Sequence, residues 1–146
     1  MSLPPSAASD ARDVNTAFYT AIESGDLDAM ERLWLDGPAS VNVCAIHPGS
    51  PPLYGRPTVL RSFAALMAGT PYIQFILTDV HVTIAGDTAV VTCMEDVLTS
   101  GQSAGAVFAA NRAVATKVMV YVGGAWKLWL HHASPVVERR VEPPDE

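Results

Sequence analysis

The spacing of hydrophobic residues divides this chain into a helical first half and a strand-rich second half. Apolar residues recur at the spacing of one helix face in three segments, and from Tyr72 onward they alternate with a period of two. The predicted helices cover residues 9–24, about 26–36 and a segment after Pro57. The predicted strands cover residues 41–46, 72–84, 88–99, 106–122 and 125–133. Helices followed by a run of hairpins indicate an α+β fold in which one antiparallel sheet wraps over the helices and encloses a pocket.

Turn residues separate the long strands. Ala85-Gly86-Asp87 and Gly123-Gly124 have the composition of tight hairpins, because glycine adopts positive φ at little cost. Residues 100–105 are expected to form a looser connection. Strands of this length exceed the usual five or six residues. We therefore expect them to bend or bulge.

Length and composition fit a single domain, expected over residues 9–135 between flexible tails at 1–8 and 136–146. Only 16% of the 146 residues are charged, which favours a surface partly covered by a second copy of the chain.

A net charge of −6 argues against nucleic acid or an anionic membrane as partner. Residues 1–6 have neither a basic patch nor an apolar segment, so we expect no secretory signal there, and no apolar run reaches the length of a membrane span. Cys44 and Cys93 lie in apolar runs and indicate buried free thiols in a reducing cytoplasm.

Four short segments stand out along the chain. They are Gly25-Asp26-Leu27-Asp28, Leu53-Tyr54-Gly55-Arg56, Val91-Thr92-Cys93-Met94-Glu95, and Gly124-Ala125-Trp126-Lys127-Leu128 leading into His131-His132-Ala133-Ser134. In these segments the chain resembles the SnoaL-like group of the nuclear transport factor 2-like superfamily, which has the cystatin-like fold and includes ketosteroid isomerase and scytalone dehydratase. The resemblance covers roughly residues 10–135. It implies a cone-shaped barrel of three N-terminal helices on a strongly curved, mixed, mostly antiparallel sheet. It also implies a homodimer through the outer sheet face, and it leaves the chemistry open.

Ketosteroid isomerase uses an aspartate base with a tyrosine and a protonated aspartate as hydrogen-bond donors, and these groups are mostly missing here. The tyrosine position falls on Phe18, which has no hydroxyl, and the second acid falls near Val114 in an apolar strand. The base position falls at or beside His47. Steroid isomerisation by that mechanism is therefore not expected.

His47 ends the first short strand, where the pocket of this fold begins, and its imidazole titrates near neutral pH. It is therefore a candidate general base. The alternative is a loop histidine that supports Pro48 and Gly49 through a backbone hydrogen bond.

Glu95 and the last strand offer further acid–base candidates. Glu95 alternates with Asp96 and shares its face with apolar residues, so it is expected to point into the pocket with a raised affinity for protons. His132 shares the parity of Trp126 and Leu128, and we expect it to point inward beside Glu95, with the adjacent His131 outward. The alternatives are a structural ion pair of Glu95 with Arg112 or a histidine, and a merely satisfied buried histidine.

The remaining candidates would contact a ligand. Arg112 interrupts an apolar strand and is suited to clamping a carboxylate, or alternatively to pairing with a local acid. The other candidate ligand-binding residues, for several of which core packing is the alternative role, are Phe18, Trp34, Tyr54, Phe63, Asn111 and Trp129.

No cofactor is expected, because phosphate loops, dinucleotide fingerprints and nucleophile elbows are absent from the sequence. A metal site from His47, His132 and Glu95 is conceivable, but nothing in their spacing requires it, and none is predicted.

The hypothesis from sequence is a small-molecule-binding SnoaL-like protein. If it is an enzyme, it acts as an isomerase or dehydratase on an apolar organic substrate through His and Glu acid–base chemistry. The alternatives are a non-catalytic ligand carrier or dimerisation module, including one whose cavity is filled by side chains.

Overall fold

A computed structural model describes residues 2–100 and 108–137, with side chains described from residue 111 in the second range. Three helices, a short 3-10 helix and six strands follow one another along the chain, and all six strands join one sheet. The helices are α1 (Ala7–Ser24), α2 (Leu27–Leu33), η1 (Pro38–Asn42) and α3 (Arg56–Gly69). The strands are β1 (Cys44–Ile46), β2 (Leu53–Tyr54), β3 (Ile73–Ala85), β4 (Thr88–Ser100), β5 (Phe108–Val122) and β6 (Ala125–Pro135).

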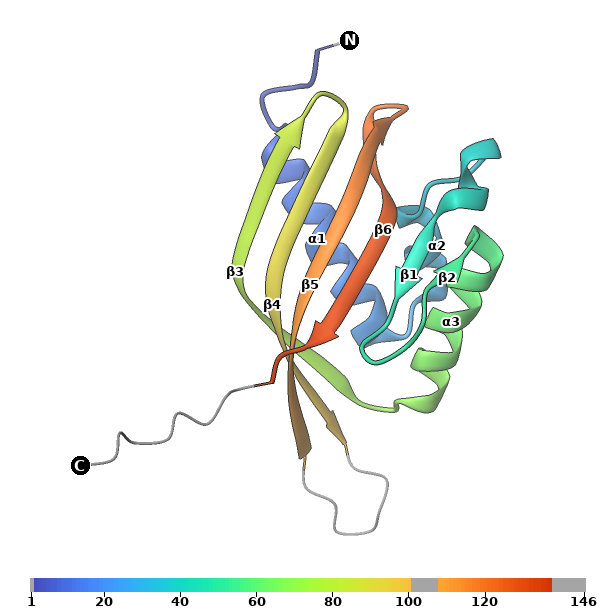
Figure 1. The fold of residues 1–146 in the computed structure, drawn as a ribbon, viewed down its shortest axis with the longest axis vertical. Coiled ribbons are helices and arrows are strands. Elements are labelled where there is room, and N and C mark those ends of the chain that lie inside the picture. Colours follow the sequence, from blue (N-terminus) through green and yellow to red (C-terminus); the bar gives the residue numbers. More distant parts are fainter. Residues whose placement is uncertain (1, 101–107, 138–146) are drawn as a thin grey trace, which may run out of the picture.

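The sheet order is β2-β1-β6-β5-β4-β3, and only the β1–β6 pair is parallel. Figure 1 shows the long strands curving together, with α1 running across one face and α3 beside the short strands β1 and β2. The predicted α+β architecture, with three helices on a curved, mostly antiparallel sheet, is confirmed. The sheet is not closed into a complete barrel, but its cone shape agrees with the expected one.

Local sequence explains the junction between α1 and α2. Gly25 adopts the left-handed conformation (φ 64°), and Asp26 N–H then reaches back to the Ala21 carbonyl at 2.9 Å. The Asp26 carboxylate accepts a hydrogen bond from Ala29 N–H at 3.0 Å and so caps α2. These two residues turn the chain sharply enough for α1 and α2 to pack against each other.

Several element boundaries differ from the prediction. α1 begins at Ala7 rather than at residue 9, because its first turn packs inward and the Ala7 carbonyl accepts a hydrogen bond from Trp126 Nε1 at 2.9 Å. The expected strand 41–46 shortens to β1, because Pro38 starts the 3-10 helix η1 before it. Strand β2 was not predicted. The connection expected at 100–105 and the tail expected at 136–146 fall largely outside the described residues.

The long strands are bulged, as their length predicts. The pairing of β3 with β4 shifts between Thr78 and His81, and Asp79 takes a positive φ of 55° there. A second shift lies between β5 and β6, where Val118 pairs with Leu130 but Met119 pairs with Leu128. Trp129 is therefore the extra residue of a bulge in β6, and the inward and outward positions of that strand exchange beyond it.

Candidate functional site

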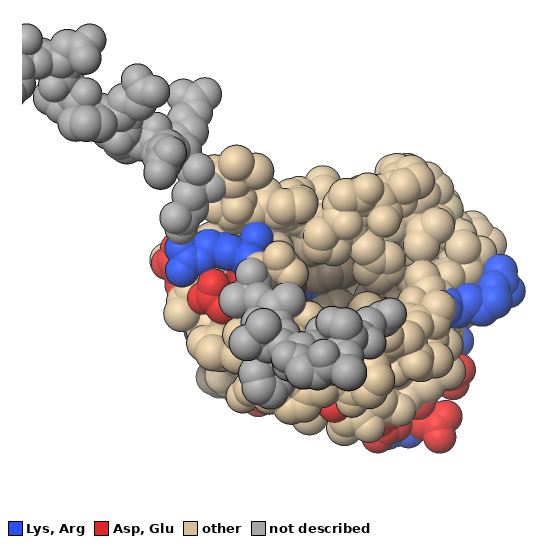
Figure 2. Space-filling view, turned by 90° about the horizontal axis from the view of Figure 1, so that it is seen from below, with Lys and Arg blue, Asp and Glu red and all other residues tan. Residues whose placement is uncertain are grey.

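The concave side of the sheet holds a cavity of about 570 Å³ between α1, α3 and the strands. Its walls are mostly apolar and aromatic, and Figure 2 shows a hollow rimmed almost entirely by uncharged residues at the corresponding end of the molecule. Eight of the eighteen described residues that line it carry polar groups, and polar groups set in a mostly apolar wall are typical of small-molecule sites. The eight are Tyr19, His47, Ser50, Ser62, Thr70, Glu95, Thr99 and His131.

Glu95 lies on the floor of this cavity and is only 4% exposed. The Tyr19 hydroxyl of α1 donates a short hydrogen bond to Glu95 Oε2. Lys117 Nζ on β5 in turn donates to the Tyr19 oxygen at 2.7 Å. The three side chains therefore form a buried chain in which a phenol joins an ammonium group to a carboxylate.

Burial governs the protonation of this chain. The pKa of Tyr19 is raised far above its ordinary value, first by burial and then by the negative charge of Glu95, so Tyr19 stays a neutral phenol. Burial lowers the pKa of Lys117 to about 8, although the charges of Cys93 and Glu95 oppose the shift. The Lys117 ammonium also lies over the rings of Phe18 and Tyr19, at 4.3 and 4.1 Å from their centroids. At neutral pH it remains the positive partner of Glu95.

His47 follows β1 and also lines the cavity. Its Nε2 lies 2.9 Å from Ser62 Oγ on α3, and its ring meets the edge of Phe63 with 5.0 Å between centroids. Ser62 Oγ also donates to the Val59 carbonyl at 2.6 Å. Partial burial lowers the pKa of His47, so its imidazole is neutral near pH 7. The partner is thus a side chain of α3, not the backbone at Pro48 and Gly49.

The predicted orientation of the two adjacent histidines is wrong. His131 is buried (4% exposed) and lines the cavity, whereas His132 lies on the outer face and is exposed, within 3.2 Å of Ser134 Oγ. The bulge at Trp129 causes this reversal, because the parity that holds for Trp126 and Leu128 no longer applies beyond it. The Glu95–His132 pair therefore does not form.

His131 takes the place on the inner face that was assigned to His132. Its ring packs on Phe18 at 4.5 Å between centroids. Burial, reinforced by the positive charge of Lys117, lowers its pKa well below the ordinary value and keeps it neutral. Its Nδ1 is buried and has no hydrogen-bond partner among the described residues.

The other predicted site residues divide into inner and outer ones. Phe18 and Phe63 line the cavity. Trp34 is buried in the core, where its Nε1 donates to Met30 Sδ at 3.4 Å, but it does not line the cavity. Tyr54 and Trp129 are exposed (64% and 42%), which contradicts a role in the cavity.

Arg112 and Asn111 also lie away from the cavity. Arg112 pairs on the outer face with Asp96, with 3.0 Å between Nε and Oδ1, so the alternative of a local ion pair is correct and the predicted clamp is wrong. Asn111 is exposed and does not line the cavity. Glu95 points inward, as the alternation of β4 predicts, while its catalytic role remains a prediction.

Three important side chains were missed or undervalued from sequence: Lys117, Tyr19 and Ser62. Lys117 shares the parity of Ala113, Ala115 and Met119, and all four of these positions are buried. A lysine within such an alternation was the signal available in the sequence. Tyr19 was treated as a packing residue, and no local pattern marks Ser62.

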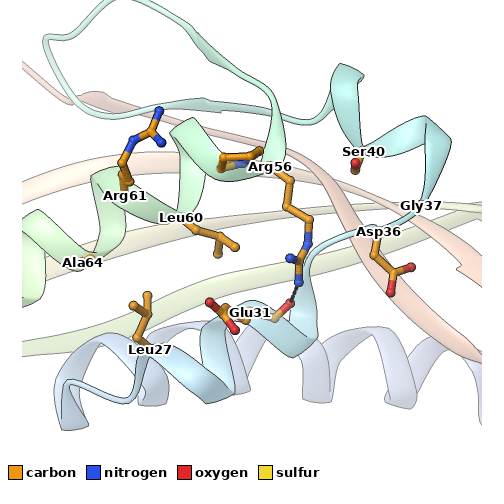
Figure 3. Close-up of a pocket in the computed structure, with 10 residues that line it drawn as sticks. Leu27, Glu31, Asp36, Gly37, Ser40, Arg56, Leu60, Arg61 and Ala64 are labelled. Carbon is orange, nitrogen blue, oxygen red and sulfur yellow. Dashed lines mark hydrogen bonds between the residues drawn. The ribbon is translucent and has the colours of Figure 1, made fainter.

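A second hollow of about 560 Å³ lies outside the cavity, between α2, η1 and α3. Figure 3 shows Arg56 and Leu60 on α3 directed toward Leu27 and Glu31 on α2, while Arg61 points away from them. Arg56 Nη2 donates to the Glu31 carbonyl at 2.6 Å. The arginine of the Gly55-Arg56 pair thus connects two helices and supports the fold.

Neither a metal site nor a membrane span emerges from the described residues. Within 2–100 and 108–137, no three His, Cys, Asp or Glu side chains are grouped closely enough to hold a metal ion. In the same part of the chain, no helix combines the length and apolarity needed to cross a membrane.

Comparisons with known proteins agree with this architecture. Residues 11–138 match the family model described as the SnoaL-like domain. A candidate dehydratase of the NTF2-like family from Streptomyces avermitilis is 45% identical, with a TM-score of 0.84, over 92% of this chain and 100% of that one. A candidate calcium/calmodulin-dependent protein kinase type II association domain from Thiobacillus denitrificans is 27% identical, with a TM-score of 0.72, over 86% and 94%.

Other similar structures share the fold at lower identity. A candidate aromatic ring hydroxylase from Novosphingobium aromaticivorans is 16% identical, with a TM-score of 0.78, over 94% of each chain. Curated protein sequences give no significant match. The family model spans most of the chain, and the Streptomyces protein matches it over nearly its whole length. The chain therefore belongs to the SnoaL-like domain family of NTF2-like proteins.

Proposed function

We propose that the protein is an acid–base enzyme that eliminates water from a small, largely apolar β-hydroxy carbonyl compound. The observation that carries this proposal is that His47 and Glu95 both line one mostly apolar cavity. The 45% identical Streptomyces protein, described as a candidate dehydratase, supports the reaction class. The cavity volume of 570 Å³ equals that of about 19 water molecules at about 30 Å³ each, which bounds the substrate to roughly that number of non-hydrogen atoms.

His47 is the proposed proton carrier. Its neutral imidazole removes a proton from the carbon beside the carbonyl group, and the electron pair moves into an enolate. The carbon–oxygen bond at the β position then breaks. The departing hydroxide takes the proton back from the imidazolium and leaves as water, which restores neutral His47. Glu95 orients the substrate by accepting a hydrogen bond from the hydroxyl group that will leave.

The test is dehydration of ring β-hydroxy ketones with up to about 19 non-hydrogen atoms, followed by the absorbance of the conjugated product. We expect His47→Gln to lower kcat by about 10²- to 10⁴-fold, the usual contribution of a general base. The charge-balanced double variant Glu95→Gln/Lys117→Met should lose activity while remaining folded.

His132→Gln is the matched control, since it changes the same residue type on the outer face and should retain full activity. Circular dichroism confirms folding of each variant. If a ketone binds in the cavity but is turned over equally by wild type and His47→Gln, the protein is a ligand carrier and the enzymatic proposal is wrong.

We further propose that the protein forms a homodimer through the outer face of the sheet. Ile76 on β3, Val114 on β5 and Trp129 on β6 are large apolar side chains there with 41–47% exposure. Large exposed apolar groups on one face are typical of an interface. We expect Val114→Asp to shift the protein from dimer to monomer in sedimentation velocity, and an unchanged dimer would contradict an interface on this face.

A further inference from the structure

We infer that the cavity selects uncharged ligands that present a hydroxyl or N–H donor, phenols and alcohols above all, over ethers and carboxylates of the same shape. The inference refines the proposed function, on which it rests for the assumption that a small organic molecule occupies this cavity. It rests on the hydrogen bonds of Glu95 and His47, because the partners of these two polar groups determine which of their atoms can still bind a ligand.

At the Glu95 end, the hydroxyl proton that faces the carboxylate is already committed. The single proton of the Tyr19 hydroxyl is donated to Glu95 Oε2, and Lys117 donates to the Tyr19 oxygen. Lys117 is fully buried beneath the cavity and does not line it. Glu95 Oε1 has no hydrogen-bond partner among the described residues, and the side chain faces the cavity. A ligand therefore meets a carboxylate oxygen, which can only accept a hydrogen bond.

The hydrogen bonds of His47 likewise leave an acceptor for a ligand. Ser62 Oγ has one proton, and its 2.6 Å distance from the Val59 carbonyl requires that proton between the two oxygens. His47 Nε2, at 2.9 Å from the same Oγ, must therefore be the donor in that bond. A neutral imidazole carries one proton, so Nδ1 keeps a lone pair. Ser62 thus holds His47 in the tautomer whose free nitrogen accepts a hydrogen bond from a ligand.

The walls offer no compensation for an anion. Among the described residues that line the cavity there is no lysine or arginine, while Glu95 contributes a negative charge. The remaining polar groups are the hydroxyls of Ser50, Thr70 and Thr99 and the neutral imidazole of His131. Each of them can act as a donor or an acceptor, so they do not impose a preference. A carboxylate ligand would face a buried carboxylate without a cation, whereas a phenol satisfies an acceptor that is otherwise unpaired.

The test compares three biphenyls that differ in one para substituent: para-phenylphenol, para-methoxybiphenyl and biphenyl para-carboxylate. Binding to the wild-type protein is measured by isothermal titration calorimetry at pH 7. We expect the phenol to bind about 10- to 100-fold more tightly than the ether, since a hydrogen bond to a charged or unpaired buried acceptor has this effect. The carboxylate should bind more weakly than the ether.

The variants Glu95→Gln/Lys117→Met and His47→Leu identify the acceptor. We expect one of them to reduce the phenol-to-ether ratio toward one, with His132→Leu on the outer face leaving the ratio unchanged. Equal binding of phenol and ether to the wild type, or preferred binding of the carboxylate, would overturn the inference while leaving a ligand-binding cavity in place. If none of the three biphenyls binds but ring ketones are dehydrated, the inference fails and the proposed function stands.

A ligand-free measurement tests the tautomer directly. Nitrogen-15 NMR of the histidine side chains at pH 7 should show His47 protonated at Nε2, with the unprotonated shift at Nδ1. In Ser62→Ala this preference should weaken, because the acceptor that fixes it is removed. Protonation of His47 at Nδ1 in the wild type would contradict the proton count.

Discussion

Removing the negative charge of the buried Glu95–Lys117 pair is expected to destabilise the protein by about 3–5 kcal/mol, whereas removing both charges should cost much less. Glu95→Gln leaves the Lys117 ammonium, which is 0% exposed, without a negative partner. Lys117→Met leaves the Glu95 carboxylate with only the Tyr19 hydroxyl to stabilise it, but it also removes the burial cost that lowers the pKa of Lys117, so it should cost less than Glu95→Gln. In the double variant neither charge is left uncompensated. Urea denaturation of all four proteins gives the coupling energy of the pair.

Asp96→Asn is the control for this cycle. Asp96 is the next residue on the same strand, but its partner Arg112 is on the outer face, and both side chains are partly exposed (33% and 49%). Exposed pairs contribute about 0–1 kcal/mol, so this change should be nearly neutral. A Glu95→Gln variant that costs less than about 1 kcal/mol, with the effects of the two single changes adding in the double variant, would refute a coupled buried pair.

The pH dependence of stability provides a second measurement on the same variants. Because the pKa of Lys117 falls from its ordinary value of 10.5 to about 8 on folding, the unfolded chain binds more protons between these two values. The contribution of Lys117 to the free energy of unfolding should therefore rise from pH 8 to 10.5, by at most about 1.4 kcal/mol per pH unit. Below pH 8 this gain is absent. Lys117→Met should lack the rise.

Much of the architecture follows from patterns within single elements. The alternation of β4 predicts that Glu95 points inward because β4 pairs with β5 in one continuous register from Thr88 to Ser100. The turn residues at 86–87 and 123–124 predict the hairpins for the same reason, since a tight turn depends on local conformation alone. Properties of this kind are readable without knowledge of the neighbouring strands.

The predictions from sequence are wrong where the orientation of a side chain depends on a second strand or helix. A bulge is a property of a pair of strands, and nothing within residues 125–135 marks Trp129 as the extra residue opposite Val118 and Met119. For this reason the predicted orientations of His131 and His132 are the reverse of those in the structure. Likewise, the tautomer of His47 depends on Ser62, fifteen residues away on a helix. Lys117 is different, because its position on a buried face was readable from the alternation of β5.

Truncation of Phe63 is expected to be the most damaging change in the cavity wall, with a cost of about 3–5 kcal/mol for Phe63→Ala. Phe63 is 1% exposed and contacts aromatic rings on three sides: Phe18 at 5.3 Å, Trp34 at 5.9 Å and His47 at 5.0 Å between centroids. Its removal joins the space of the ring to the existing cavity and leaves these neighbours without a packing partner. Urea denaturation measures the loss.

Phe75→Ala is the matched control, because Phe75 lines the same cavity but is only partly buried and, among the described residues, contacts a single ring, that of Tyr19, at 4.9 Å. We expect it to cost about 1–2 kcal/mol, in proportion to the smaller apolar area it buries. A ligand that fills the enlarged cavity should restore part of the stability of Phe63→Ala, since binding to the folded state alone raises the free energy of unfolding. Equal costs for the two substitutions would show that Phe63 is not the residue around which the cavity wall is packed.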